Sequence, residues 1–392
     1  MCHVFSTILT AAALLSLLSV PGNALACPFC GVPSLTLSEQ IAAADTALLV
    51  RWRDGQPTEG GEYGAGRTEY DVEQIIRDGS GTLKQQTRLS IHEYHLGSSG
   101  EMFLLLGTRT DERFKWSTPL AVSEAGSRYI LNAPASDLPV RDRLPYYIEF
   151  LEDPDPLIAE DAYSEFARAP YGDVVPLKEK MSREKLRRWL TDPEITPTRI
   201  GLYGLMLGLC GNAEDVSFLK SLVIKETEEF RIGIDGVMAG YLLLAGEPAL
   251  QAINESKLSN EHASLNETYA AMQALSFIWE DGNGQISQDR LRESMRKLLN
   301  RPSLVEFVVV NLARWKDWEA VDPLITLYES ADQQDRGTRR AIIRFMLAAE
   351  SEKPISLDPA PPEQARKAKE FLARLRKDDP RIIEQAKRAY FD

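Results

Sequence analysis

Residues 199–209 read RIGLYGLMLGL, and residues 231–241 read RIGIDGVMAGY, a near copy 32 residues further along the chain. Self-similarity at this period is typical of helical repeat arrays, in which no unit buries its apolar face alone and neighbouring units stack to form the core. The chain is therefore expected to be mainly a scaffold of stacked helices.

Each copy places its glycines three and four residues apart, on one face of the expected helix: Gly201, Gly204 and Gly208, and then Gly233, Gly236 and Gly240. A glycine inside a helix costs roughly 1 kcal/mol relative to alanine, so six cost roughly 6 kcal/mol, against a net stability of roughly 5 to 15 kcal/mol for a domain. We expect close contact between the two helix backbones to offset that cost, so the glycines predict a packing seam. Membrane insertion is not expected, because the apolar run 200–210 is too short to span a bilayer.

The composition is that of a globular protein. The chain has 392 residues, of which 44% are hydrophobic and 26% charged, enough for two or three domains. Its net charge of −13 argues against nucleic acid or an anionic membrane surface as the main partner, since both select basic surfaces.

Residues 1–26 have the pattern of a signal peptide. An apolar stretch runs from Ile8 to Val20, and Ala24, Leu25 and Ala26 form a small-x-small cleavage site before Cys27. The sequence predicts cleavage after Ala26 and export to the periplasm, the envelope or the medium. A lipoprotein acylated on Cys27 is the alternative, although Ala24 stands where a lipobox usually has leucine.

The cysteines next to the predicted cleavage site form a C-x-x-C motif. Cys27 and Cys30 enclose a Pro-Phe pair, and the motif resembles the active motif of glutaredoxins. In that family the first thiol follows a strand at a helix N-terminus, which lowers its pKa. No strand can precede Cys27 in the mature chain, so we expect a disulfide or thiol pair that acts as a local tether. Cys210 ends an apolar helix and is expected to be a buried, inert thiol.

Two parts of the sequence resemble metal sites. Zinc could be held by Cys27, Cys30, His92 and His95, since two thiolates and two imidazoles make a tetrahedral set. Residues three apart on a strand face opposite ways, however, which favours two surface histidines. Residues 281–287 resemble the middle of an EF-hand loop, with ligand types at Asp281, Asn283 and Gln285. Trp279 and Arg290 replace the two carboxylates at its ends, so we expect a turn between helices and no calcium.

The region 27–132 is expected to hold a short helix at 38–44 and then a small β domain. Runs rich in Val, Ile, Leu, Tyr and Thr alternate with glycine-rich turns, at 46–52, 68–76, 87–93, 102–106 and 129–131. Five short strands favour a barrel or a sandwich. The region resembles the OB-like barrels of the netrin or metalloprotease-inhibitor type, which also open on a mature N-terminal cysteine. The later cysteines of that family are missing, so no function is carried over.

Helical periodicity follows a proline-rich linker at 133–145. Beyond Arg199 and Arg231, first helices are expected to begin near Thr268, Glu306 and Arg339, with second helices at 213–225, 248–258, 287–300 and 319–330. This order resembles HEAT repeats, and residues 316–328 look like the turn and second helix of one unit. The aligned first-helix positions do not form the regular Asp and Arg ladder of many HEAT proteins, which leaves armadillo-like arrays open.

The array is expected over 146–350, followed by a proline-rich break at 351–362 and a basic helical cap at 363–392. Such a cap is usually solvated, and docking of an acidic partner is the alternative. A C-P-F-C opening followed by such repeats also resembles uncharacterised secreted bacterial proteins, which supplies no activity.

The sequence therefore predicts a multidomain α+β protein, a small N-terminal β-barrel or sandwich followed by an all-α HEAT-like solenoid. The expected function is an exported, non-enzymatic scaffold that binds a protein partner, without nucleic acid, cofactor, metal or transmembrane span. No catalytic residue is assigned, since there is no G-x-S-x-G elbow and His262 is the only histidine of the helical half. The alternative is a thiol-redox or metal-binding protein that uses Cys27 and Cys30, with the solenoid as its docking arm.

Overall fold

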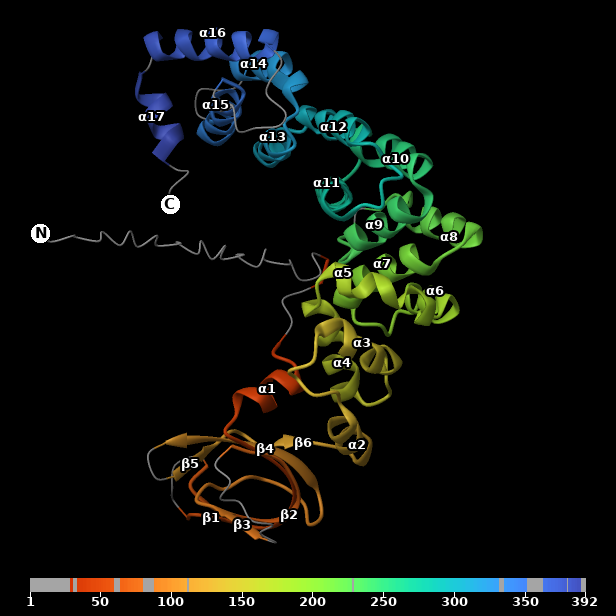
Figure 1. Ribbon diagram of the computed structural model, residues 1–392, viewed down its shortest axis with the longest axis vertical. Coiled ribbons are helices and arrows are strands. Elements are labelled where there is room, and N and C mark those ends of the chain that lie inside the picture. The colour runs from red at the N-terminus through yellow and green to blue at the C-terminus, as the bar shows by residue number, and fades with distance from the viewer. Residues whose placement is uncertain are drawn as a thin grey trace, which may run out of the picture.

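The computed structural model describes residues 29–30, 34–59, 64–79, 88–110, 113–227, 229–330, 335–350, 362–378 and 380–388. The predicted signal peptide and Cys27 lie outside these ranges. The described chain is α+β, as the sequence predicts: a curled antiparallel sheet stands at one end, and a curved row of helices leads away from it to α17 (Figure 1).

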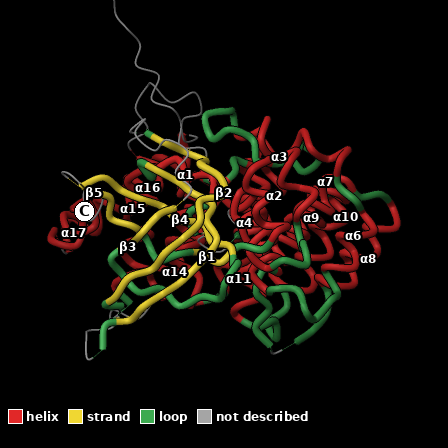
Figure 2. Tube along the Cα trace, turned by 90° about the horizontal axis from the view of Figure 1, so that it is seen from below, coloured by secondary structure: helices red, strands yellow, loops and turns green. Residues whose placement is uncertain are grey.

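The sheet has six described strands: β1 (Thr46–Pro57), β2 (Gly66–Asp78), β3 (Arg88–Ile91), β4 (Met102–Thr110), β5 (Arg113–Trp116) and β6 (Leu120–Ala121). Their order is β3-β2-β1-β4-β5, β6 pairs with β4, and all pairs are antiparallel. The register of β1 against β2 shifts at three places, and such irregularities bend and twist a strand. The result is a single sheet curled into a half-barrel, which Figure 2 shows in front of the helices.

The first half of β1 is buried on both faces. Leu48 and Val50 face a small core inside the curl, which they share with Tyr70 and Phe103. Leu49 points the other way and belongs to the large core that runs through the helices. Because side chains alternate along a strand, burial of both faces explains the unbroken apolar run at this position.

The predicted strand at 129–131 is wrong, because these residues belong to α2 (Glu124–Asn132). Ser123 caps this helix by accepting a hydrogen bond from the backbone N–H of Gly126. The side chain of Tyr129 packs on aromatic rings of the next helix, including Tyr146 at 5.5 Å. Aromatic and β-branched composition favours a strand in isolation, but here the cap and tertiary packing override it.

Part of the predicted linker is also helical. Helix α3 (Val140–Tyr147) contains Pro145 and buries Leu144 and Tyr147. Proline is tolerated in the first turn of a helix, and Pro145 lies further in than that. The burial of its two apolar neighbours supplies the stabilisation that outweighs the missing hydrogen bond.

The helical row is built of consecutive pairs, with the first helices on the inner side of the curve and the second helices on the outer side (Figure 1). The pairs are α7 (Ile200–Cys210) with α8 (Ala213–Val223), α9 (Ile234–Ala245) with α10 (Glu247–Ile253), α11 (Leu265–Asp281) with α12 (Gln288–Arg296), and α13 (Val305–Arg314) with α14 (Val321–Ser330). Each observed first helix begins within three residues of its predicted start.

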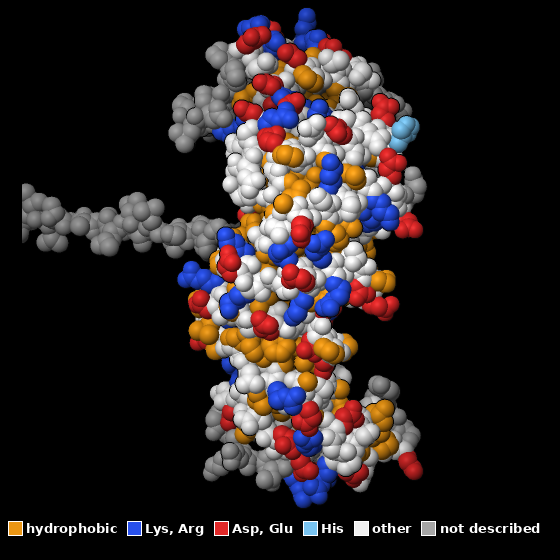
Figure 3. Space-filling model, turned by 90° about the vertical axis from the view of Figure 1, so that its right-hand side faces the viewer, with side chains coloured by type: hydrophobic (Ala, Val, Ile, Leu, Met, Phe, Trp, Pro, Cys, Tyr) orange, Lys and Arg blue, Asp and Glu red, His pale blue; other side chains and the backbone are white. Residues whose placement is uncertain are grey.

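The remaining described helices complete both ends of the row. Before α7 they are α1 (Leu37–Ala43), α4 (Pro156–Arg168), α5 (Tyr171–Val174) and α6 (Arg183–Trp189), and after α14 they are α15 (Arg336–Glu350), α16 (Pro362–Asp378) and α17 (Pro380–Arg388). Acidic and basic side chains are interspersed over the outer side of the row (Figure 3). Interspersed charges of both signs avoid a large field of one sign on this side of the row.

The glycine seam between the two sequence copies is confirmed. Helices α7 and α9 pack with their backbones so close that a Cβ atom added to Gly204 would lie 2.5 Å from the Cα atom of Val237. A Cβ on Gly208 or Gly240 would overlap the backbone of the facing helix. The prediction is wrong in one detail: Gly233 precedes α9 with a φ of 80°, a left-handed conformation that glycine adopts without strain.

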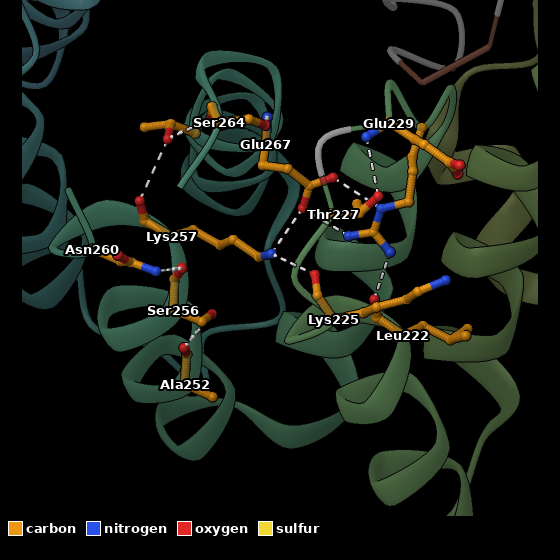
Figure 4. A network of polar contacts seen from close by, with 12 residues as sticks. Leu222, Lys225, Thr227, Glu229, Ala252, Ser256, Lys257, Asn260, Ser264 and Glu267 are labelled. Carbon is orange, nitrogen blue, oxygen red and sulfur yellow. Dashed lines mark hydrogen bonds and ion pairs between the residues drawn. The ribbon is translucent and has the colours of Figure 1, made fainter. Parts of the chain in front are cut away.

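Buried ion pairs join successive units of the row. Glu267 of α11 binds Arg231 at 2.7 Å and Lys257 at 2.8 Å, and the side chains of Lys257 and Glu267 are each only 3% exposed. Lys257 also donates to the carbonyl of Lys225 at the end of the preceding unit (Figure 4). Burial would raise the pKa of Glu267, but the hydrogen bonds from Arg231 and Lys257 outweigh it and hold that pKa below its usual value.

The first sequence copy has its own version of this contact. Arg199, which aligns with Arg231, is buried and binds Glu152 at 3.0 Å and Glu160 at 2.7 Å. The aligned arginines therefore do carry ion pairs between units, although their acidic partners lie at different distances along the chain. These unequal distances explain why the sequence shows no regular Asp and Arg ladder.

A second buried network fastens α1 to the helical row. Asp161 of α4 accepts hydrogen bonds from the backbone N–H of Leu37 and from the hydroxyl of Tyr129, both at 2.6 Å. Its neighbour Glu165 binds Arg143 at 2.9 Å. Burial raises the pKa of Asp161 to about 6, and the hydrogen bonds oppose that rise without cancelling it.

This raised pKa predicts a pH dependence of stability. The folded pKa of Asp161 lies above the ordinary value of 3.8, so the folded state holds its proton more tightly. The contribution of Asp161 to stability is then greatest below about pH 4, falls as the pH rises to about 6, and is level above it. Asn in its place keeps both contacts, because the amide can accept from Leu37 and donate to Tyr129. Urea unfolding of the parent and of Asp161→Asn should show the variant gaining relative stability between pH 4 and pH 6. A constant difference would contradict the prediction.

Candidate functional site

A groove lies between the neighbouring first helices α11 and α13. It encloses about 570 Å³ and is lined by one face of α11 and one of α13, with Phe29 from the N-terminal segment: Phe29, Tyr269, Met272, Gln273, Ser276, Phe277, Glu280, Asp281, Glu306, Phe307, Val310, Asn311 and Arg314. The α11 residues recur at three- and four-residue intervals, which places them along a single face of the helix.

Aromatic contacts set the direction and spacing of the two helices. The rings of Tyr269 and Phe307 meet at 6.0 Å near the start of both helices. Trp279 and Trp315 stack at 4.6 Å towards their ends. Helices α11 and α13 therefore run parallel, and the groove between them has one end at Tyr269 and the other at Asp281.

The floor of the groove exposes apolar surface. Tyr269 is 40% exposed, Phe307 52% and Val310 46%, and all three belong to adjacent turns of these helices. Single exposed apolar residues are common on protein surfaces, whereas a contiguous patch within a hollow is typical of a binding site. Two side-chain amides, Gln273 and Asn311, stand in the same hollow. The Nδ2 atom of Asn311 donates to the carbonyl of Phe307 at 3.1 Å, which leaves its Oδ1 atom and the Gln273 amide to hydrogen-bond a ligand's main chain.

Phe29 fills the Asp281 end of the groove. Its ring meets Phe277 edge to face at 5.0 Å, and the ring of Tyr171 also meets Phe277 edge to face at 5.0 Å. The backbone of Phe29 lies against α7, where a Cβ on Gly201 would come 2.7 Å from the Phe29 carbonyl oxygen. The sequence assigns Phe29 to the β-rich region, and nothing in its local pattern predicts this contact with residues far along the chain.

The charged residues of the groove leave it acidic. Glu280 and Arg314 pair at 3.0 Å. Asp281 and Glu306 form no ion pair with any described residue, and Glu306 faces the first turn of α15 at Gly337. The pKa of Asp281 is raised, first by burial and then by the neighbouring charge of Glu280. Burial, with a smaller effect of Asp281, raises the pKa of Tyr171 to about 12.

The polar side chains of the described lining include carboxylates, amides and a serine hydroxyl. The lining contains no histidine or cysteine, and the Ser276 hydroxyl donates to the carbonyl of Met272 in its own helix. Nucleophilic catalysis needs a nucleophile within reach of a base, and the described lining offers no such pair.

The predicted cysteine pair can be followed only at Cys30, because Cys27 lies outside the described residues. Cys30 is disulfide-bonded, and it lies in a turn beside Phe29 rather than between a strand and a helix. Cys210 is a free thiol that is half-buried rather than fully buried as predicted, and burial raises its pKa to about 11. A thiol with that pKa is protonated and unreactive at neutral pH.

The zinc set is not assembled from the residues that the structure describes. His92 is exposed at the end of β3, whereas His95 turns inward, where its Nδ1 atom lies 3.0 Å from the hydroxyl of Tyr70. Cys30 is already in a disulfide and packs with the helical row. Over the described ranges, no group of three or more metal-ligating side chains comes together.

The EF-hand-like segment is a turn between α11 and α12, as expected. Gly284 has a φ of 79°, and the Asn283 amide donates to the carbonyl of Leu243 at 2.9 Å. Ser287 caps α12, and Arg290 binds Glu247 of the preceding unit at 3.2 Å. The side chain of Asn283 therefore fastens the turn to the neighbouring pair of helices.

Comparison with known proteins adds little to this geometry. No family model matches the chain, and no curated protein matches it. Among solved structures, human deoxyhypusine hydroxylase in complex with glycerol aligns over 63% of this chain and 84% of its own, with 15% identity and a TM-score of 0.26. A similarity this weak carries no argument about fold or function. No helix within the described ranges combines the length and hydropathy needed to cross a bilayer.

Proposed function

We propose that the protein is an exported, non-enzymatic scaffold that binds a protein partner in the groove between α11 and α13. The observation that carries the proposal is the apolar floor formed by Tyr269, Phe307 and Val310 inside a hollow with amide side chains. An aromatic and aliphatic hollow with a few polar groups is the usual anatomy of a recognition site.

The array itself is proposed to be a HEAT-like solenoid, and the half-barrel to be OB-like. The solenoid is supported by the paired helices, whose first members begin at intervals of 31 to 40 residues, and by the glycine seam between α7 and α9. Stacked pairs of this kind create an extended inner surface on which partners bind. The groove lies on that side of the row, between two first helices.

Export is supported by the apolar stretch before Cys27 and by the disulfide at Cys30, since disulfides persist in oxidising compartments. Mass spectrometry of the native protein should find a chain that begins at Cys27, and acyl mass on that residue would show lipidation. A chain that retains Met1 would refute the proposed cleavage.

The binding proposal is tested by capture from the native exported fraction with three baits. The parent and Phe230→Ser are expected to retain the same partner, and Phe307→Ser is expected to lose it at least tenfold. Phe230 is a matched control because it is 67% exposed and lies outside the groove. Quantitative mass spectrometry supplies the readout, and thermal unfolding verifies that all three baits fold. Equal recovery with all three baits would refute the groove as the docking surface.

A further inference from the structure

Two carboxylates that form no ion pair with any described residue stand at opposite ends of the apolar floor of the groove. Glu306 precedes Phe307, whose ring meets Tyr269 at the start of α11, and Asp281 is the last residue of α11. From Tyr269 to Asp281 the helix rises about 18 Å, at about 1.5 Å per residue. An extended chain covers that distance in about five residue steps, at about 3.3 Å each.

Phe29 shows which kind of side chain packs on the floor of the groove. It is an aromatic residue in a turn, outside any helix or strand, it is 6% exposed, and its ring packs against Phe277. The part of the floor nearer to Tyr269, with Phe307 and Val310, presents the same kind of surface without such a cover among the described residues. A second aromatic or large aliphatic side chain from a non-helical segment would bury it in the same way.

The charge of the groove predicts which residues flank the apolar side chain of a bound segment. Among the described residues, the lining holds Glu280, Asp281 and Glu306 against one cation, Arg314, which is already engaged by Glu280. An acidic ligand would meet uncompensated like charge at both ends, whereas Lys or Arg would pair there.

We infer that the groove binds an extended peptide segment in which aromatic or large aliphatic residues stand between two basic residues about five positions apart. The inference rests on the proposed function and specifies its partner. The flanking cations set orientation and association rate, and the central side chains supply the buried apolar area. Gln273 and Asn311 face the middle of such a segment, where its main-chain groups need hydrogen-bond partners.

The test uses fluorescein-labelled hexapeptides and the mature protein. Lys-Ser-Phe-Leu-Ser-Lys should bind with saturable anisotropy and with an affinity that weakens as salt is added. Glu-Ser-Phe-Leu-Ser-Glu and Lys-Ser-Ala-Ala-Ser-Lys should each bind at least tenfold more weakly. Equal affinity for the lysine and glutamate peptides would overturn the inference that basic residues flank the bound segment. Equal affinity for the Phe-Leu and Ala-Ala lysine peptides would overturn the inference that its centre is apolar.

Substitutions in the groove test whether the peptide binds there. Asp281→Asn and Glu306→Gln should each weaken the lysine peptide several-fold, and Phe307→Ser should abolish saturation. Glu255→Gln, which removes an exposed carboxylate that does not line the groove, should leave the affinity unchanged. Binding that survives all three groove substitutions overturns the inference.

The two proposals fail separately. If Phe307→Ser loses the native partner while no hexapeptide binds, the peptide chemistry is wrong and the docking surface stands. If Phe307→Ser retains the native partner and no hexapeptide binds, both are wrong.

Discussion

Replacing Gly204 by alanine is expected to lower the free energy of unfolding by roughly 1 to 3 kcal/mol, although alanine is the better helix former by roughly 1 kcal/mol. The added methyl would lie 2.5 Å from the Cα atom and 2.8 Å from the backbone nitrogen of Val237. Backbone atoms cannot rotate away as a side chain can, so α7 and α9 must separate along their seam. Separation also weakens the packing around Gly208 and Gly240, which is why the effect is expected to be large.

Gly172→Ala is the matched control for that substitution. Gly172 is also helical, in α5, but a Cβ there would meet no atom within 4 Å. Alanine at this position should stabilise by up to roughly 1 kcal/mol, so the two substitutions are expected to differ in sign. Urea unfolding followed by circular dichroism measures both. A stabilising Gly204→Ala would refute the seam as an account of why α7 and α9 hold together.

The sequence predicts the helical row well because each unit carries its own local signals. The copied glycines identify α7 and α9, and side-chain caps such as Asn212 and Ser264 mark helix starts that periodicity alone leaves uncertain. The failures occur where tertiary contacts outweigh local preference. Tyr129 has the composition of a strand residue, yet it lies in a helix because α3 and α4 bury its ring and bind its hydroxyl.

The groove could not be predicted in the same way. Its apolar floor combines Tyr269 with Phe307, which are far apart in the chain, and their exposure is a property of how α11 and α13 stack. An exposed phenylalanine looks the same in sequence as a buried one. Phe29 is harder still, because its partners Phe277 and Gly201 lie beyond the whole β-rich region. Only the acidic balance of the chain as a whole hints at the charge of the site.

Buried ion pairs are a second feature that residue spacing in the sequence does not predict. The ion pairs of Glu267 allow their contribution to the free energy of unfolding to be measured. Glu267→Gln is expected to cost roughly 3 to 5 kcal/mol, because Arg231 and the buried Lys257 would lose their counter-charge. Adding Lys257→Met to that variant should recover part of the loss, since it removes the charge that cannot reach water. Glu370→Gln is the control, because its pair with Arg366 is about 60% exposed on both sides and such pairs contribute less than about 1 kcal/mol.

The pH dependence separates a charge effect from a packing effect in this cluster. The pKa of Glu267 is lowered in the folded state, so its contribution to stability is complete above its ordinary value of 4.5 and is lost as the pH falls through the lower folded pKa. The difference between parent and Glu267→Gln should therefore be constant from pH 6 to pH 8 and shrink below about pH 4.5. Urea unfolding over this range measures it. A difference that is independent of pH would mean that Glu267 acts through packing and hydrogen bonding alone, and the ion-pair account of how α9, α11 and the helical segment at Lys257 are joined would be wrong.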